Sequence, residues 1–123
     1  MRDTSSQFYK KLLGGKGELI VETYLKNNGY KILEKNYRTN FGEADIIAVI
    51  GDLLVFVEVK TRSGYKYGAP AEAVGFYKQN RYVKLAEYYA LKNPKYRDKC
   101  VRFDVAEVID DEVNYIENAF YCR

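Results

Sequence analysis

The chain of 123 residues has no histidine, only two cysteines and two prolines, and no long apolar run. Without histidine, the Ser–His–Asp and Cys–His nucleophilic systems are excluded, and the usual zinc ligand is missing. Cys100 and Cys122 lack the Cys-x-x-Cys spacing of zinc ribbons and thioredoxin-type motifs. We therefore expect free thiols in a reducing compartment, the cytoplasm. The polar N-terminal residues predict no signal peptide, and apolar runs of about five residues predict no membrane span.

Charge is distributed unevenly along the chain, although the net charge is only +3. Residues 41–59 contain four acidic residues and no lysine or arginine, whereas residues 60–102 contain eleven basic residues against three acidic ones. An acidic segment followed directly by a basic one indicates a site that holds a polyanion beside a metal ion. A solvated, lysine-rich helix face is the other interpretation of such a basic run.

The pattern of apolar residues predicts one α/β domain over residues 1–123, with a mixed β-sheet flanked by helices. Helical spacing predicts a first helix over Gln7–Asn28, where the pair Asn28–Gly29 is a natural stop. A second, amphipathic helix is predicted within Ala71–Leu91. Strands are predicted from five runs of apolar residues: Tyr30–Tyr37, Glu43–Ile50, Leu53–Lys60, Cys100–Ile109 and Val113–Phe120.

The most informative feature is the junction Gly51–Asp52, which alone separates two strand-like segments. Glycine at the first central position suits a two-residue type II′ hairpin turn. Counting outward from this turn brings four charged residues opposite one another on one sheet face, Asp45 with Glu58 and Glu43 with Lys60. At an effective dielectric of about 20, two carboxylates roughly 5 Å apart repel by roughly 3 kcal/mol. A divalent cation between Asp45 and Glu58 would offset this repulsion.

Asp45, Glu58 and Lys60 form the pattern D-(x12)-E-x-K, which suits hydrolysis of a phosphodiester. This reaction needs charge neutralisation on the phosphate and a nucleophile made from water, and Mg²⁺ or Mn²⁺ held by one or two carboxylates supplies both. We expect Asp45 and Glu58 to be metal ligands. We expect Lys60 to assist the nucleophile electrostatically, a role preferred over that of general base. The alternative is a set of ordinary ion pairs on a solvated sheet face.

Glu18 lies on the same side of the first predicted helix as Val21 and Leu25, where a carboxylate facing the core is unusual. It is a candidate supporting residue or further metal ligand, although a solvated helix residue would give the same pattern. Four basic side chains are candidates for contacts with phosphates, Arg62 and Lys66 after the hairpin and Lys78 and Arg81 on the second helix.

Arg102 and Asp104 are two residues apart in the predicted strand Cys100–Ile109, so their side chains share one face. We expect them to form a structural ion pair rather than to take part in catalysis.

Further motifs are spread over nearly the whole chain, from about Phe8 to Phe120: Gly17–Glu18, Tyr24–Leu25, Gly29–Tyr30, Asn36–Arg38, Gly42–Ala48, Phe56–Arg62 and Arg102–Val105. Together they resemble the YraN-like family of small bacterial proteins. That family is similar to the archaeal Holliday junction resolvases within the PD-(D/E)xK nuclease superfamily. One departure is that Glu43–Ala44–Asp45 replaces the Pro–Asp of the superfamily's name, with the aspartate retained.

The resemblance implies a restriction-endonuclease-like domain over the whole chain. It implies that Asp45, Glu58 and Lys60 are the catalytic trio and that Glu18 matches the acid of the superfamily's first helix. The leading expectation is a Mg²⁺- or Mn²⁺-dependent endonuclease acting on DNA, with branched or damaged DNA among the candidate substrates. The alternatives are a non-catalytic nucleic-acid-binding module with a nuclease-like fold and, last, a protein–protein adaptor. A homodimer is a candidate assembly by analogy with resolvases, which cut two strands symmetrically.

Overall fold

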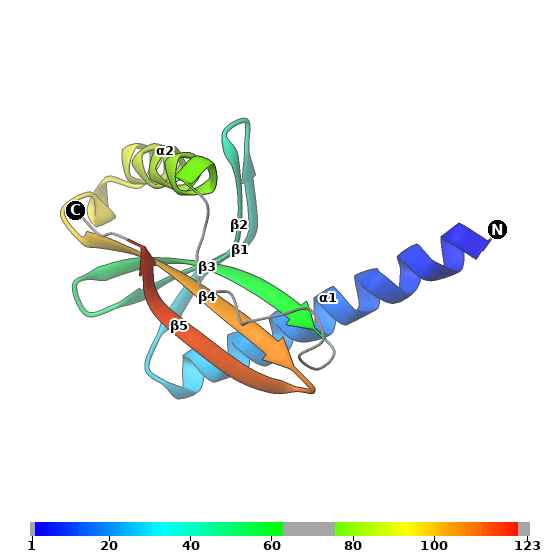
Figure 1. Cartoon of the computed structure of the whole chain (residues 1–123). Coiled ribbons are helices and arrows are strands. Elements are labelled where there is room, and N and C mark those ends of the chain that lie inside the picture. Colours follow the sequence, from blue (N-terminus) through cyan, green and yellow to red (C-terminus); the bar gives the residue numbers. More distant parts are fainter. Residues whose placement is uncertain (1, 63–75, 121–123) are drawn as a thin grey trace.

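A five-stranded sheet lies between two helices in the computed structural model (Figure 1). The structure describes the backbone of residues 2–62 and 76–120, and side chains within residues 15–62 and 80–117. The elements follow one another in the order α1 (Arg2–Asn27), β1 (Lys31–Thr39), β2 (Gly42–Ile50), β3 (Leu53–Arg62), α2 (Phe76–Lys92), a short 3₁₀ helix η1 (Pro94–Tyr96), β4 (Cys100–Ile109) and β5 (Glu112–Phe120).

The strands lie in the sheet in the order in which they occur in the chain, β1-β2-β3-β4-β5. Strands β3 and β4 are parallel, and the other three neighbouring pairs are antiparallel. The parallel pair requires a crossover connection, and α2 is part of that connection. The prediction of an α/β fold with a mixed sheet flanked by helices is therefore confirmed.

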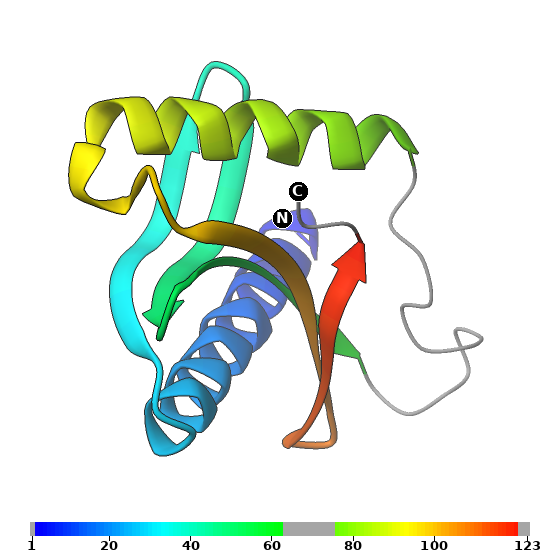
Figure 2. The same cartoon turned by 90° about the vertical axis from the view of Figure 1, so that its left-hand side faces the viewer.

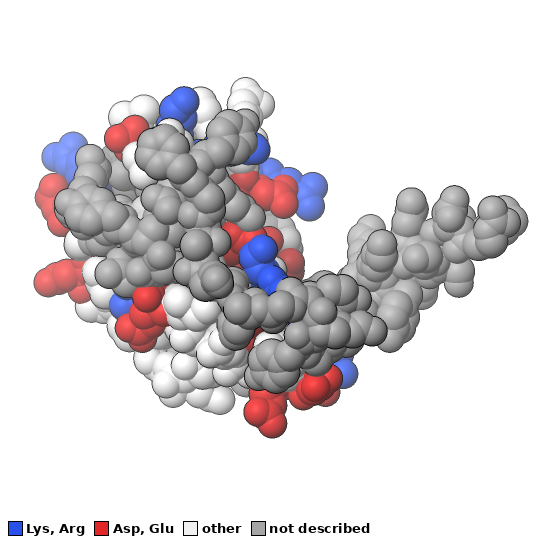
Figure 3. Space-filling model, viewed as in Figure 1, with Lys and Arg blue, Asp and Glu red and all other residues white. Residues whose placement is uncertain are grey.

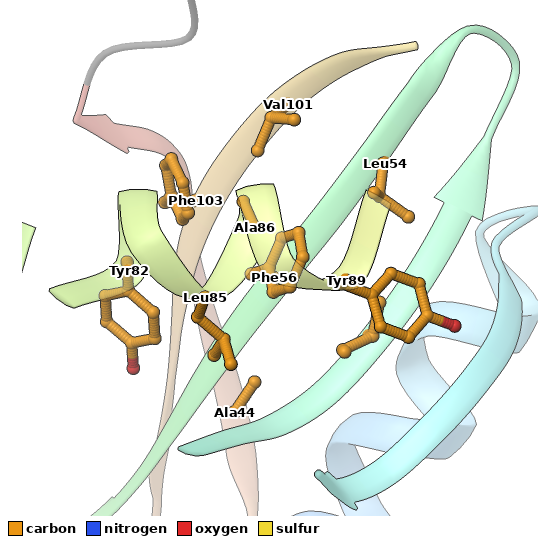
Figure 4. Close-up of a cluster of buried hydrophobic side chains, with 10 residues drawn as sticks. Ala44, Leu54, Phe56, Tyr82, Leu85, Ala86, Tyr89, Val101 and Phe103 are labelled. Carbon is orange, nitrogen blue, oxygen red and sulfur yellow. The ribbon is translucent and has the colours of Figure 1, made fainter. Parts of the chain in front are cut away.

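The two helices cover opposite faces of the sheet (Figure 2). Val21 and Leu25 of α1 pack against one face, together with Ile46, Val55 and Val57. The opposite face packs against α2 through a cluster of aromatic and aliphatic side chains (Figure 4). Strand residues alternate between the two clusters, because successive side chains of a strand point to opposite faces. Buried on both sides, β2 and β3 form the predicted central hairpin.

The turn between β2 and β3 has the predicted form. Gly51 has a φ of 55°, and Asp52 is not among the described residues with positive φ. This combination fits a type II′ turn, which needs positive φ only at its first central residue. Ile50 pairs with Leu53 across the turn, as the residue count predicts.

The first helix differs from its predicted extent, because it begins at Arg2 and continues through three glycines. Glycine weakens a helix but does not break it, and no proline interrupts this segment. Gly17 faces Thr61 on β3 so closely that a Cβ atom there would overlap Oγ1 of Thr61 unless the threonine side chain moved. The glycine thus lets α1 approach the C-terminal end of β3 closely, which brings the neighbouring Glu18 to the same end of the sheet.

Two expectations about the environment of the protein have different outcomes. Within the described residues, neither helix is both long and apolar enough to span a membrane. The expectation of free thiols was wrong for Cys100, which is disulfide-bonded. Cys122 lies outside the described residues. A sequence shows the spacing of cysteines but not the distance between their sulfur atoms in the fold, so this pairing could not be predicted.

Candidate functional site

The site begins where β2 and β3 separate. Their ladder runs from Ile50–Leu53 to Ile46–Val57 and stops one pair before Asp45 and Glu58. Beyond this point the β1–β2 pair diverges from β3 toward α2 (Figure 1). Oδ2 of Asp45 accepts a hydrogen bond from the backbone N–H of Val59 at 2.7 Å. The carboxylate thus occupies the place of a backbone acceptor and lies in the fork between the two strands.

Glu58 lies on the sheet face that packs against α2. Its Oε1 accepts a hydrogen bond of 3.0 Å from the hydroxyl of Tyr82, and its Oε2 is 3.6 Å from Nζ of Lys60. Burial and the adjacent Glu58 carboxylate raise the pKa of the Tyr82 hydroxyl far above its ordinary value. Tyr82 is therefore a permanently protonated donor that fixes the position of Glu58.

Figure 4 shows the rings of Tyr82 and Tyr89 at the two sides of the apolar cluster, with their hydroxyls pointing out of it. Both rings are buried and both come from α2. The hydroxyl of Tyr89 donates to Glu34 on β1 at 3.1 Å, while that of Tyr82 donates to Glu58. The helix is thus joined to carboxylates at two separate places, of which only one belongs to the site.

Asp45 and Glu58 open into one cleft of about 580 Å³, called here the Asp45–Glu58 cleft. Its walls come from the end of the β1–β2 hairpin, from β3 and from α2, and its lining residues are Arg38, Thr39, Asn40, Gly42, Glu43, Asp45, Glu58, Arg81, Tyr82 and Leu85. Two arginines therefore accompany three carboxylates. Such a mixture suits a ligand that carries negative charge and binds a cation at the same time.

Glu18 reaches the edge of this cluster from the α1 side. Burial and the charge of Asp45 raise the pKa of Glu18, and Glu43 acts more weakly in the same direction. A hydrogen bond with the side chain of Asn36 and the charge of Arg38 oppose these effects without cancelling them. The cluster of carboxylates at the end of β2 therefore includes Glu18 as well as Asp45 and Glu58.

Replacing Glu18 by glutamine is expected to stabilise the folded protein at pH 7. Because the pKa of Glu18 is higher in the folded than in the unfolded state, the folded state holds its proton more firmly, and stability falls as the pH rises above about 4.5. Glutamine has no charge to lose or gain, so the variant avoids this loss of stability. In urea unfolding, its free energy of unfolding should exceed that of wild type near neutral pH and should equal it below the ordinary pKa of glutamate.

The matched control is Glu22→Gln, one helical turn later. Ion pairs with Lys26 at 2.9 Å and Lys35 at 3.3 Å lower the pKa of Glu22, so this change should reduce stability at pH 7. Equal responses of the two variants to pH would contradict the assignment of Glu18 to the carboxylate cluster.

The carboxylates of the cleft resemble the protein ligands of a magnesium site more than those of a site formed by protein side chains alone. No group of three or more His, Cys, Asp or Glu side chains is arranged to hold a metal ion among the residues that the structure describes. Mg²⁺, however, is typically held by one or two carboxylates, with water and substrate phosphates as the remaining ligands. Asp45 and Glu58, lining one cleft, meet this requirement. The residues therefore fit a Mg²⁺ or Mn²⁺ ion that binds together with a phosphate-containing substrate.

The predicted phosphate-contacting residues lie in different places. Arg81 lines the Asp45–Glu58 cleft, and its Nε donates to the carbonyl oxygen of Phe41 at 3.1 Å. Arg62 is the last residue of β3 and forms an ion pair of 3.2 Å with Glu107, which is fully buried. Lys66 lies outside the described residues, as does the side chain of Lys78.

The predicted pairing of Glu43 with Lys60 was wrong. Glu43 lies opposite Arg38 of β1, and their side chains form an ion pair of 3.5 Å. The β2–β3 ladder ends before Glu43, so this residue follows β1 away from Lys60. The residue count assumed a ladder that continues to the ends of both strands, whereas the strands separate at Asp45.

No separate basic patch is seen among the described residues on the face drawn in Figure 3. Acidic and basic side chains alternate over the described part of this face. One basic residue of the segment 60–102, Arg62 on β3, forms an ion pair with an acid of the neighbouring strand β4, the buried Glu107. Within the described residues, the cleft itself offers two arginines, Arg38 and Arg81, for contacts with phosphates.

Sequence reasoning missed two residues of the site. Arg38 lines the cleft, and Tyr82 holds Glu58. Tyr82 follows the amphipathic pattern of α2 and was counted as an apolar contact, so only the structure shows its hydroxyl at a carboxylate. Arg38 belongs to the motif Asn36–Arg38, which is part of the family resemblance but had been assigned no role in the site.

The predicted pair of Arg102 and Asp104 forms, and neither residue is among those that line the cleft. The Arg102 guanidinium donates to Asp104 through Nε at 3.0 Å and through Nη2 at 2.9 Å. The hydroxyl of Tyr115 donates to Asp104 at 2.6 Å, and Arg102 donates to Tyr30. This network joins β4, β5 and the loop between α1 and β1, which is a structural role.

Known proteins that are similar to this chain share one family description. The model of the family described as "Uncharacterised protein family UPF0102" matches residues 17–108, a range that includes all four predicted catalytic residues. A UPF0102 protein of Clostridium botulinum (strain 657 / Type Ba4) is 46% identical over 119 residues, which cover 92% of this chain and 97% of that protein. A UPF0102 protein of Alkaliphilus oremlandii (strain OhILAs) is 48% identical over 115 residues, which cover 89% and 98%. These names state a family and no activity.

Proposed function

This chain belongs to the uncharacterised protein family UPF0102, the YraN-like family that its motifs resemble, and we propose that it is a metal-dependent endonuclease that hydrolyses phosphodiester bonds in DNA. One observation carries the proposal: Asp45 and Glu58, from neighbouring strands, line one cleft together with Arg38 and Arg81. Carboxylates for a divalent cation and guanidinium groups for phosphates are then found within a single site.

Each residue has a role that follows from its position. Asp45 and Glu58 would hold Mg²⁺ or Mn²⁺, while Arg38 and Arg81 would bind phosphate oxygens of the strand. Lys60, 3.6 Å from Glu58, would orient the attacking water or stabilise charge that develops on the phosphate. Glu18 would support Asp45 from the α1 side. When bound, the ion would neutralise phosphate charge and lower the pKa of a coordinated water.

The second candidate is a nucleic-acid-binding module with this fold and no catalysis. It is favoured by the contacts of Glu58, whose two oxygens already face the Tyr82 hydroxyl and the Lys60 ammonium. A carboxylate with these partners is stable without a cation. The two candidates differ in metal dependence, because only the endonuclease needs Mg²⁺ or Mn²⁺ to act.

The test is incubation of the purified protein with linear, nicked, flapped and four-way DNA in Mg²⁺, in Mn²⁺ and in EDTA. The endonuclease proposal predicts cleavage of at least one substrate with either metal and none in EDTA. Binding in EDTA without cleavage under any condition would contradict it and support the non-catalytic module. Binding should weaken steeply with salt in either case, since phosphate contacts release counterions.

The proposal extends to location and assembly. An enzyme of this kind would meet its DNA in the cytoplasm. Because Cys100 is disulfide-bonded, the argument from free thiols is lost, and this location now rests on the proposed substrate. A homodimer would place two such sites against two strands, as symmetric cleavage requires. Sedimentation of the protein with and without DNA measures directly whether it is a monomer or a dimer.

Replacing Tyr82 by phenylalanine is expected to weaken Mn²⁺ binding about tenfold to a hundredfold, as loss of a partner that orients a metal ligand commonly does. The change removes the hydroxyl that donates to Glu58 and keeps the buried ring. Calorimetric titration with Mn²⁺ in the presence of DNA measures the affinity. Tyr89→Phe is the matched control, because it removes an equivalent hydrogen bond from the same helix to Glu34. Equal affinities of the two variants would contradict the role of Tyr82.

A further inference from the structure

A second hollow adjoins the Asp45–Glu58 cleft and has a different chemistry. It measures about 260 Å³ and is called here the aromatic pocket. Three of its lining residues are aromatic, Tyr37, Phe41 and Tyr88, and the other three, Arg38, Thr39 and Asn40, also line the Asp45–Glu58 cleft. The two hollows therefore share a wall, which is the end of the β1–β2 hairpin.

Phe41 is the exposed member of this pocket. It keeps 42% of its surface exposed, although its ring contacts Tyr88 edge to face at a centroid distance of 5.4 Å. A large apolar side chain at a hairpin tip gains little from burial when so much of it stays in water. The packing on Tyr88 therefore does not fully account for a phenylalanine here.

The backbone around Phe41 is held firmly in place. Oγ1 of Thr39 accepts from the N–H of Phe41 at 3.0 Å and donates to the carbonyl oxygen of Gly42 at 3.1 Å. Arg81 donates from Nε to the carbonyl oxygen of Phe41 at 3.1 Å. The backbone that carries the exposed Phe41 ring is thus held by Thr39 and by an arginine of the neighbouring cleft. Such preorganisation lowers the entropic cost of binding a flat ligand.

Positive charge accompanies the aromatic rings. Arg38 lies in the wall between the two hollows, and Nζ of Lys92 is 5.7 Å from the centre of the Tyr88 ring. Aromatic faces next to cations are the combination by which proteins bind single-stranded nucleic acid, with bases on the rings and the backbone on the charges. Bases within a duplex are stacked on one another and cannot enter such a pocket without being extruded.

We propose that the aromatic pocket stacks an unpaired base of the DNA strand whose backbone lies in the Asp45–Glu58 cleft. The preferred substrate is then DNA with single-stranded nucleotides beside the cleavage site, such as a flap. This inference rests on the proposed function for the identity of the strand. It assigns to Phe41 a contact with the base, which neither the motif nor the family description provides.

The test measures binding in EDTA, where no cleavage takes place. Fluorescence anisotropy with a short labelled oligodeoxythymidylate and with a blunt duplex of equal length gives the two affinities. Wild-type protein should bind the single strand more tightly than the duplex. Phe41→Leu keeps an apolar side chain but removes the flat ring, and it should weaken single-strand binding by about 5-fold to 150-fold, the equivalent of one lost stacking contact. Phe41→Trp should retain the affinity.

Leu91→Ala is the matched control, because Leu91 is an exposed apolar residue of α2 that lines neither hollow. It should bind both DNAs as wild type does. Unchanged single-strand binding by Phe41→Leu, or an equal loss for single strand and duplex, would overturn the inference. So would a Phe41→Leu protein that changes only its self-association, since the pocket would then be a contact between two copies. Cleavage in Mg²⁺ is scored separately, so that loss of the proposed function and loss of the base contact are distinguishable.

Discussion

Replacing Asp45 by asparagine is expected to reduce metal-dependent cleavage of DNA by at least about a thousandfold. The change removes one of two carboxylates at the cleft, and stabilisation by a bound cation is worth several kcal/mol in such reactions. The amide oxygen of asparagine can still accept the hydrogen bond from Val59, so the fork between β2 and β3 should persist. Rates on the best substrate of the DNA panel, with Mg²⁺ and with Mn²⁺, measure the effect.

The matched control is Asp52→Asn, which makes the same chemical change at the other end of the same hairpin, in the exposed turn. It should leave the cleavage rate unchanged. Asp45→Asn should also be at least as stable as wild type, because it relieves the repulsion between Asp45 and Glu18. A variant that cuts DNA normally, or that loses activity only because it unfolds, would contradict the role of Asp45.

Replacing Arg102 by methionine is expected to lower the free energy of unfolding by about 3–5 kcal/mol, the usual result of removing one partner from a buried ion pair. Asp104 has 2% of its surface exposed, and the guanidinium neutralises its charge through hydrogen bonds from two nitrogens. Methionine preserves much of the side-chain volume while leaving the carboxylate buried beside Tyr115. The midpoint and slope of urea unfolding give the loss directly.

Two further variants show that the effect comes from the buried charge. Arg97→Met changes an exposed arginine and should alter stability by no more than about 0.5 kcal/mol. Adding Asp104→Asn to Arg102→Met should recover part of the lost stability, because it removes the uncompensated charge. If both Arg102 variants were as stable as wild type, the network would not be the structural element described above.

Much of the fold was predictable because the local signals agree with one another. The pair Gly51–Asp52 between two apolar runs fixes both the turn and the register, and the structure has Ile50 opposite Leu53 as expected. Strand β4 was predicted with its observed bounds, Cys100–Ile109, since its apolar residues alternate with Arg102 and Asp104, as is typical of a strand. The ion pair of Arg102 with Asp104 follows from the same alternation of side chains.

The parts that were missed depend on contacts between distant segments. Beyond the point where it leaves β3, β2 packs against α2, which lies far from it in the sequence, so the partner of Glu43 could not be read from the turn. The hydroxyl of Tyr82 finds Glu58 only after the helix has docked. Arg62 was expected on a binding surface, whereas the neighbouring strand β4 provides the buried Glu107 as its partner.

The central claim is that Asp45 and Glu58 together hold one divalent cation. A crystal of the protein soaked in Mn²⁺ and measured at a wavelength where manganese scatters anomalously tests it most directly. The account predicts one anomalous peak within bonding distance of an oxygen from each of the two carboxylates, absent from a crystal of Asp45→Asn. A wild-type crystal with no peak in the cleft, and Glu58 still held by Tyr82 and Lys60, would contradict it.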